Sequence, residues 1–116
     1  MPTPRTSAGD EAVRAFGRRL EFLIYREQMR RQRGVTQREV AEGVSDALGL
    51  DPPLRVTTVS RWVLGQSIPD VVVMGAIAAF FGADPGWLAF GDRSQAPKPV
   101  GAYCVPDEET AATSAR

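Results

Sequence analysis

The sequence predicts an all-α fold, a compact domain of five helices over residues 10–92 with a disordered segment at each end. Apolar residues in this range recur every three or four positions, the spacing that places them on one face of an α-helix. Each such segment is bounded by glycine, proline or a capping side chain, and none shows the alternation typical of a strand. Residues 1–9 and 93–116 have no periodic apolar face, and their composition predicts a disordered lead and tail.

The first predicted helix covers residues 10–33 and is the longest of the five. Asp10 and Glu11 stand at its start, where carboxylates are favourable, and Gly34 supplies a stop signal. The apolar face comprises Val13, Phe16, Leu20, and Leu23 or Ile24.

The second predicted helix begins at a capping box, in which the side chains of Thr36 and Glu39 accept from each other's backbone amides. We expect this helix to end near Gly49. It cannot continue through Pro52 and Pro53, because neither proline can donate a hydrogen bond and each forces the residue before it into extended geometry.

Three shorter helices follow, and each has a start signal and a glycine stop. The third is expected over residues 56–64 before Gly65, the fourth from Pro69 and Asp70 to Gly82, and the fifth from Asp84 and Pro85 to Gly91.

The composition argues against catalysis and metal binding. The chain of 116 residues has no histidine and one cysteine, Cys104. Imidazole-based catalysis, an internal disulfide and most metal sites are therefore excluded, and we predict a protein that is not an enzyme and takes no cofactor. No small-molecule ligand is evident. No apolar run reaches the roughly 18 residues that span a bilayer, and the first residues do not resemble a secretory signal, so a cytoplasmic protein is expected.

The charges are unevenly distributed although the formal net charge is zero. Eight arginines and two glutamates give residues 14–38 a net charge of +6, whereas residues 39–93 carry −4. Such asymmetry can mark a surface that binds an anionic polymer, and it also fits a solvated amphipathic helix. The sequence leaves both interpretations open.

The order of elements in the middle of the chain is that of a helix-turn-helix motif: a Thr-capped helix, a connection and a short helix that bears hydroxyls and an arginine. In this motif the second helix enters the major groove of DNA. Thr57 and Ser60 can donate to phosphates or bases, Val56 can touch a thymine methyl, and Arg61 can pair with guanine. Trp62, with the valine three residues before it, lies on the opposite face and is expected in the core.

Three segments resemble the lambda-repressor-like, Cro/XRE-type helix-turn-helix DNA-binding domains: "GVTQREVAEGVS", "TTVSRWVLGQSIPD" and "AIAAFFGADPGWLAFGD". The resemblance covers about residues 16–92. The second of these segments holds two of the family's characteristic pieces, the reading helix and a Gly-x-x-x-Pro link, so four pieces occur in the right order. It implies a compact five-helix domain that binds double-stranded DNA.

The resemblance also implies roles for individual residues. Gln37 matches the glutamine that contacts a backbone phosphate and braces the reading helix, and Arg38 would lie beside it near the phosphates. Base reading would fall to Arg55, Val56, Thr57 and Arg61, with Thr58 and Ser60 flanking them as phosphate or secondary contacts.

Two departures from the family pattern affect these roles. The 21 residues between Thr36 and Thr58 are several more than is typical, so either the second helix is longer or a proline-bent loop follows it. Arg55 stands where the family has a Ser or Thr cap, and Thr57 is an alternative cap that would shift the helix start by two residues.

We therefore predict a sequence-specific transcriptional regulator, a repressor that occupies a promoter and inserts its third helix, about residues 56–64, into the major groove. Tight binding needs two copies, so a symmetric dimer on a pseudo-palindromic site is expected. Its candidate surface is Phe22, Tyr25, Trp87, Leu88 and Phe90. The alternative is a protein-interaction adaptor, or an antitoxin-like protein, that uses the same fold to bind a protein partner.

Overall fold

The computed structural model describes residues 4–97, and within them it confirms the five predicted α-helices. They are α1 (Pro4–Arg31), α2 (Gln37–Leu48), α3 (Val56–Val63), α4 (Val71–Phe81) and α5 (Pro85–Phe90), followed by a short 3-10 helix, η1 (Arg93–Gln95). No strand occurs in this part of the chain, which confirms the all-α class. No helix within it combines the length and the apolar character needed to cross a membrane.

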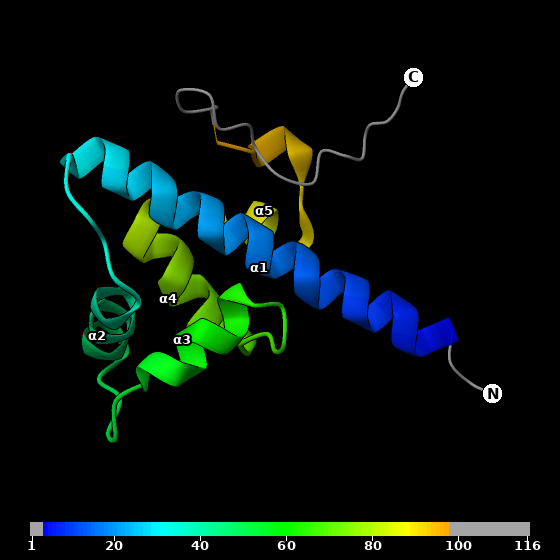
Figure 1. Cartoon of the computed structure of the whole chain (residues 1–116), viewed down its shortest axis with the longest axis horizontal. Helices are drawn as coiled ribbons and strands as arrows, with labels where there is room; N and C mark the ends of the chain where they lie inside the picture. The colour runs from blue at the N-terminus through cyan, green and yellow to red at the C-terminus, as the bar shows by residue number, and fades with distance from the viewer. Residues whose placement is uncertain (1–3, 98–116) are drawn as a thin grey trace.

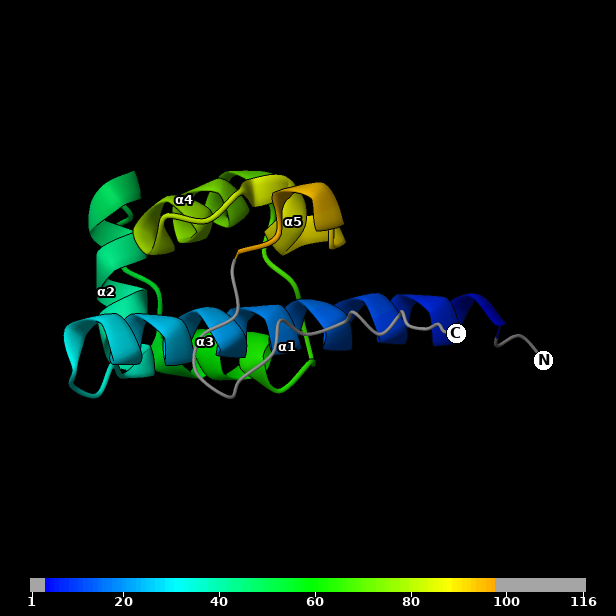
Figure 2. The ribbon, with the colours of Figure 1, turned by 90° about the horizontal axis from the view of Figure 1, so that it is seen from above.

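The helices form two layers that α2 joins at one end (Figures 1 and 2). α1 and α3 lie side by side in one layer, and α4 and α5 form the other. α2 packs against both α3 and α4. The first turns of α1 project beyond the other helices in both views. This arrangement holds α3 between α1 and α2, with one side turned away from the core.

Aromatic side chains fill the space between α1 and α5. Phe22 and Trp87 are completely buried and meet edge to face, with ring centroids 6.2 Å apart. Leu88 is also completely buried. The prediction that these three residues form a dimer surface is therefore wrong, because they complete the core. Of the other two predicted members, Tyr25 is half-buried and Phe90 is 87% exposed.

The helix starts are fixed largely as the sequence predicts. Thr36 Oγ1 accepts from the Glu39 amide at 3.1 Å, and Glu39 Oε1 accepts from the Thr36 amide at 3.0 Å, which confirms the capping box. Asp84 caps α5, with Pro85 as its first residue. At α4 the prediction is wrong by one detail, because Pro69 precedes the helix and the Asp70 carboxylate is its cap, accepting from the Val73 amide.

The ends of the described chain differ from the prediction. α1 begins at Pro4 and ends at Arg31, so residues 4–9 are helical and the predicted disordered lead is wrong for them. Proline suits the first turn of a helix, and a helix already nucleated extends at little cost through residues of moderate propensity. At the other end η1 lies within the predicted tail, and Asp92 caps it. Residues 1–3 and 98–116, with Cys104, lie outside the described residues.

The connection between α2 and α3 is the proline-bent loop, one of the two alternatives that the sequence leaves open. α2 ends at Leu48, and Gly49 adopts the left-handed conformation with a φ of 63°. The loop is tied to α2 by the buried Ser45, whose hydroxyl accepts from the Leu54 amide at 2.8 Å and whose carbonyl accepts from the Leu50 amide at 3.0 Å. These bonds hold both ends of the insertion against α2, so α3 still starts next to it.

α1 and α3 approach each other most closely at Gly17. A Cβ atom at this position would lie 2.6 Å from the carbonyl oxygen of Trp62 and 2.7 Å from that of Val63. No real Cβ tolerates such distances to backbone atoms, so only glycine allows this approach. The contact presses the end of α3 onto α1 and fixes which side of α3 is covered.

Candidate nucleic-acid interface

α3 has one side in the core and one side in solvent. Val59 is completely buried and Trp62 is 3% exposed, as the sequence predicts for the inner side. Thr57 and Arg61, one turn apart, are exposed on the outer side. This division follows from the helical period, which returns a side chain to the same face every three or four residues. The exposed face of α3 is therefore available to a large ligand.

None of the eight predicted site residues is buried. Four are exposed and four are half-buried, so each keeps part of its side chain in solvent. The exposed ones are Arg38, Arg55, Thr57 and Arg61, and the half-buried ones are Gln37, Val56, Thr58 and Ser60.

The start of α3 is set by Arg55, which is the N-cap residue. Its backbone is extended, and its carbonyl accepts from the amides of Thr58 and Val59 at 3.0 and 3.4 Å. Its side chain makes no capping hydrogen bond. The alternative in which Thr57 caps the helix is therefore wrong, and Val56 is the first residue of α3. The guanidinium of Arg55 stands free at the helix start, where it can reach a ligand.

Four of the predicted site residues meet at one depression between α2 and α3. Arg38 from α2 faces Arg55, Val56 and Thr57 across a hollow of about 410 Å³. Glu42 lines the same hollow, although the sequence-based prediction omitted it. Its spacing of four residues from Arg38 on one helix face is the signal that could have found it. Its carboxylate can orient an arginine or accept from a base amino group.

The remaining predicted residues lie outside this depression. Gln37 lines a separate groove between α1 and the α2–α3 pair, where it lies near Tyr25 and Val63. Thr58, Ser60 and Arg61 belong to no described cavity and continue along α3. Gln37 thus shares a groove with residues of α1 and α3 and keeps part of its side chain in solvent.

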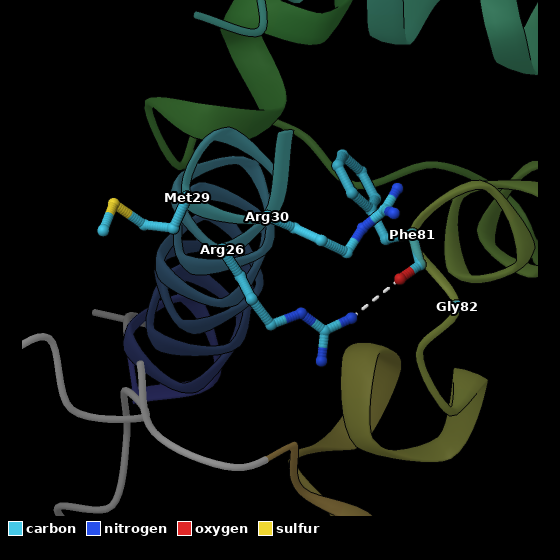
Figure 3. Close-up of a pocket in the computed structure, with 5 residues that line it drawn as sticks. All are labelled: Arg26, Met29, Arg30, Phe81 and Gly82. Atoms are coloured by element: carbon cyan, nitrogen blue, oxygen red, sulfur yellow. Dashed lines mark hydrogen bonds between the residues drawn. The ribbon is translucent and has the colours of Figure 1, made fainter. Parts of the chain in front are cut away.

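Two arginines of α1 form hydrogen bonds to the ends of other helices. Arg26 Nη2 donates to the carbonyl of Phe81, the last residue of α4, at 2.7 Å, and Figure 3 shows the side chain reaching across to it. Arg19, itself buried, donates from Nε to Leu88 at 2.8 Å and from Nη2 to Ala89 at 3.2 Å, near the end of α5. A cation at a helix C-terminus satisfies carbonyls that lack an intrahelical partner. These charges therefore stabilise the packing of α1 on α4 and α5.

Other arginines of α1 pair with glutamates. The buried Glu27 carboxylate accepts from Arg30 and from Arg31 Nε, the latter at 2.6 Å. The hydrogen bond from Arg30 lowers the pKa of Glu27, with a smaller contribution from Arg31. Arg33, two residues after the end of α1, similarly lowers the pKa of Glu39, to which it donates at 2.9 Å. Most arginines between residues 14 and 38 thus have a partner within the fold, whereas Arg18 and Arg38 are exposed and no described group pairs with them.

Three exposed cations lie at the candidate site. Within residues 9–97, Arg38, Arg55 and Arg61 make no hydrogen bond or ion pair that would occupy their guanidinium groups, and all three are exposed. They come from the start of α2 and from the two ends of α3. Unpaired, exposed guanidinium groups on neighbouring helices are suited to phosphates and to the edges of guanine.

The chain matches the family model described as Helix-turn-helix over residues 27–88, just over half of its length. The match begins in the last turns of α1 and ends in α5, so all eight predicted residues lie inside it. No curated protein and no solved structure matches the chain. The resemblance to Cro/XRE-type domains is confirmed by the family match and by the five helices in their expected order. The chain belongs to the Cro/C1-type helix-turn-helix family, whose members are DNA-binding regulators.

Proposed function

We propose that the chain is a sequence-specific transcriptional regulator that inserts α3 into the major groove. The observation that carries this proposal is the division of α3, in which Val59 and Trp62 are buried while Thr57 and Arg61 are exposed. A helix fixed to the protein by one side and free on the other fits the width of the groove. Arg61 then pairs with a guanine, and Thr57 contacts a base or its methyl group.

Phosphate contacts would supply most of the affinity. Arg38 and Arg55 flank the depression between α2 and α3 and carry guanidinium groups that no described partner neutralises. In this arrangement Gln37, the first residue of α2, donates a hydrogen bond to a DNA phosphate. Neutralising phosphates releases bound counterions, so binding falls steeply as salt rises.

The regulator acts as a dimer on two half-sites and represses by occupying a promoter. One domain offers only a few phosphate contacts, which limits a single copy to weak binding. Two copies related by a two-fold axis place their α3 helices one duplex turn apart and read a pseudo-palindrome. Occupying such a site blocks the polymerase without any catalytic step, in keeping with the composition of the chain.

The proposal is tested by binding the full chain to duplexes that it selects from a randomised library. We expect Arg61→Ala to lower affinity at least tenfold, a loss of about 1.4 kcal/mol, because a guanine contact is removed. Arg38→Ala should weaken binding to all duplexes alike and reduce the salt slope by about one. Arg93→Ala is the control, because Arg93 is an exposed arginine in η1 outside the site.

Two results would oppose the proposal. If Arg61→Ala binds the selected duplex as tightly as the wild-type chain, α3 does not read bases. If the chain selects no duplex but retains a protein partner after Arg61→Ala, the adaptor or antitoxin-like alternative is favoured.

A further inference from the structure

Glu42 is an exposed carboxylate in a surface that otherwise suits anionic DNA. It lies on α2 and lines the depression between α2 and α3 together with Arg38 and Arg55. Among the described residues, no hydrogen bond or ion pair joins the Glu42 side chain to either arginine. The depression thus presents two cations and one anion. A carboxylate at this place repels phosphates and so opposes general binding to DNA.

We propose that Glu42 is a specificity-determining residue that accepts a hydrogen bond from the amino group of a cytosine in each half-site. The inference rests on the proposed function and deepens it, because it names one base of the half-site and the side chain that selects it. At any other base the carboxylate stays unpaired beside the duplex, and binding is weaker.

The position of the depression places Glu42 next to the proposed reading face. Thr57 belongs both to the depression and to the exposed side of α3, which also carries Arg61. The hollow therefore opens on the side of α3 that the proposed function turns toward the bases. It adjoins the first residues of α3, and the first turn of a reading helix is the part that contacts base edges.

The inserted loop between α2 and α3 holds the two walls of the hollow together. Leu54, the last loop residue before the cap of α3, donates from its amide to the hydroxyl of Ser45 at 2.8 Å. Ser45 is buried and lies three residues after Glu42 on α2. This bond fixes the start of α3 against the middle of α2. The Glu42 carboxylate is therefore presented by a helix in a fixed place, as precise recognition requires.

The chemistry of the base pairs favours cytosine over the other three bases. An ionised carboxylate only accepts hydrogen bonds, and in the major groove only cytosine and adenine carry an amino group. The adenine amino group lies beside the N7 acceptor of the same base, which repels a carboxylate, whereas cytosine presents no acceptor at this edge. Guanine and thymine present acceptors and no donor.

The two arginines make a carboxylate tolerable in this surface. The guanidinium groups of Arg38 and Arg55 line the hollow with Glu42 and offset its charge as DNA approaches. The remaining repulsion weakens binding to every duplex, and the hydrogen bond to cytosine offsets it only at the correct site. A repulsive group of this kind raises specificity, which is a difference between affinities.

The test compares two substitutions that each remove one negative charge from α2. Glu42→Gln changes the side chain in the hollow. Asp46→Asn is the matched control, because Asp46 is exposed one turn further along the same helix and does not line the hollow. The wild-type chain and both variants each select duplexes from the same randomised library. We expect Glu42→Gln to change the preference at one position of each half-site from cytosine toward adenine, because glutamine pairs with adenine N6 and N7.

Titration of single duplexes gives the size of the effect. Replacing the selected C·G pair by T·A should weaken binding of the wild-type chain and of Asp46→Asn at least tenfold. The same replacement should weaken binding of Glu42→Gln less than about threefold, because its carboxylate is gone. Both variants should bind a duplex of random sequence more tightly than the wild-type chain does, since each lacks one repulsive charge.

Two results would overturn this role of Glu42. If Glu42→Gln selects the same bases as Asp46→Asn at every position, the carboxylate reads no base. If Glu42→Gln loses preference evenly at all positions, the carboxylate acts only on the arrangement of Arg38 and Arg55. Urea unfolding of both variants checks that the fold is unchanged, as the exposure of both side chains predicts.

These outcomes are distinct from failure of the proposed function. A wild-type chain that selects no duplex removes the function and the role of Glu42 together. If the wild-type chain selects duplexes and Arg61→Ala loses one base preference while Glu42→Gln keeps them all, the role of Glu42 fails and the function stands.

Discussion

Arg55 places an exposed cation at the candidate interface, in a position where another side chain would stabilise the helix better. It occupies the N-cap of α3, where a short hydroxyl or carboxylate side chain would accept a backbone amide, and its own side chain makes no such bond. Its guanidinium is exposed and lines the depression with Arg38 and Thr57. The residue is therefore a poor cap that presents a cation to the candidate interface.

We expect Arg55→Ser to stabilise the fold and weaken DNA binding together. A serine at the N-cap should raise the free energy of unfolding by about 0.5–1 kcal/mol, because it satisfies an amide at the start of α3. Loss of the cation should lower affinity for the selected duplex several-fold and reduce the salt slope. Urea unfolding and duplex titration measure the two effects. A variant that is less stable, or that binds as tightly as the wild-type chain, would contradict this role.

At the scale of elements, α1 is the helix that holds the others in place. Gly17 allows it to touch α3, and Arg19 and Arg26, two turns apart, bind carbonyls at the ends of α5 and α4. Its last turns carry the buried Glu27 with Arg30 and Arg31 around it. Arg19, Arg26 and Glu27 thus act in packing, although the sequence alone places them in a basic segment.

The Glu27 cluster predicts acid sensitivity. Because Arg30 and Arg31 lower the pKa of Glu27 in the folded protein, its ionised form contributes stability above the ordinary glutamate pKa of about 4.3. That contribution is lost as the pH falls from there through the lower folded value. Glu27→Gln should therefore reduce stability at pH 7 by on the order of 1 kcal/mol and flatten its fall toward pH 3.

Urea unfolding at both pH values measures this effect, with Glu21→Gln as the control because Glu21 is an exposed glutamate of the same helix. The free energies of unfolding of the wild-type chain and of Glu27→Gln should differ at pH 7 and become equal toward pH 3. If Glu27→Gln lowers the free energy of unfolding equally at pH 7 and pH 3, the Glu27 side chain contributes through packing alone and not through its charge.

For the molecule as a whole, local signals predicted the helices, whereas contacts between helices could not be read from the sequence. Thr36, Glu39 and Asp84 act within one turn of the chain, so their capping roles were visible beforehand. α5 has six residues, too few for a periodic pattern to tell that Trp87 is buried and Phe90 exposed.

For the candidate site as well, the sequence predicted what depends on one helix and not what depends on contacts between helices. Periodicity placed Trp62 inside and Arg61 outside, because α3 is amphipathic over its whole length. The depression shared by Arg38 and Arg55 depends on how the inserted loop returns to α2. The hydrogen bond from the Leu54 amide to the Ser45 hydroxyl fixes this return, and it joins residues nine apart in a segment that the motif does not contain. Charge counting could not show which arginines pack inside the fold, since the partners of Arg19 and Arg26 lie more than fifty residues away.

The central claim is that the exposed side of α3 reads bases. The most direct measurement compares the base preferences that the wild-type chain and Arg61→Ala display when each selects duplexes from the same randomised library. We predict that the variant loses preference at one position of each half-site and keeps the others, because a single side chain is removed from an otherwise intact reading helix. Identical preferences for both proteins would contradict the account.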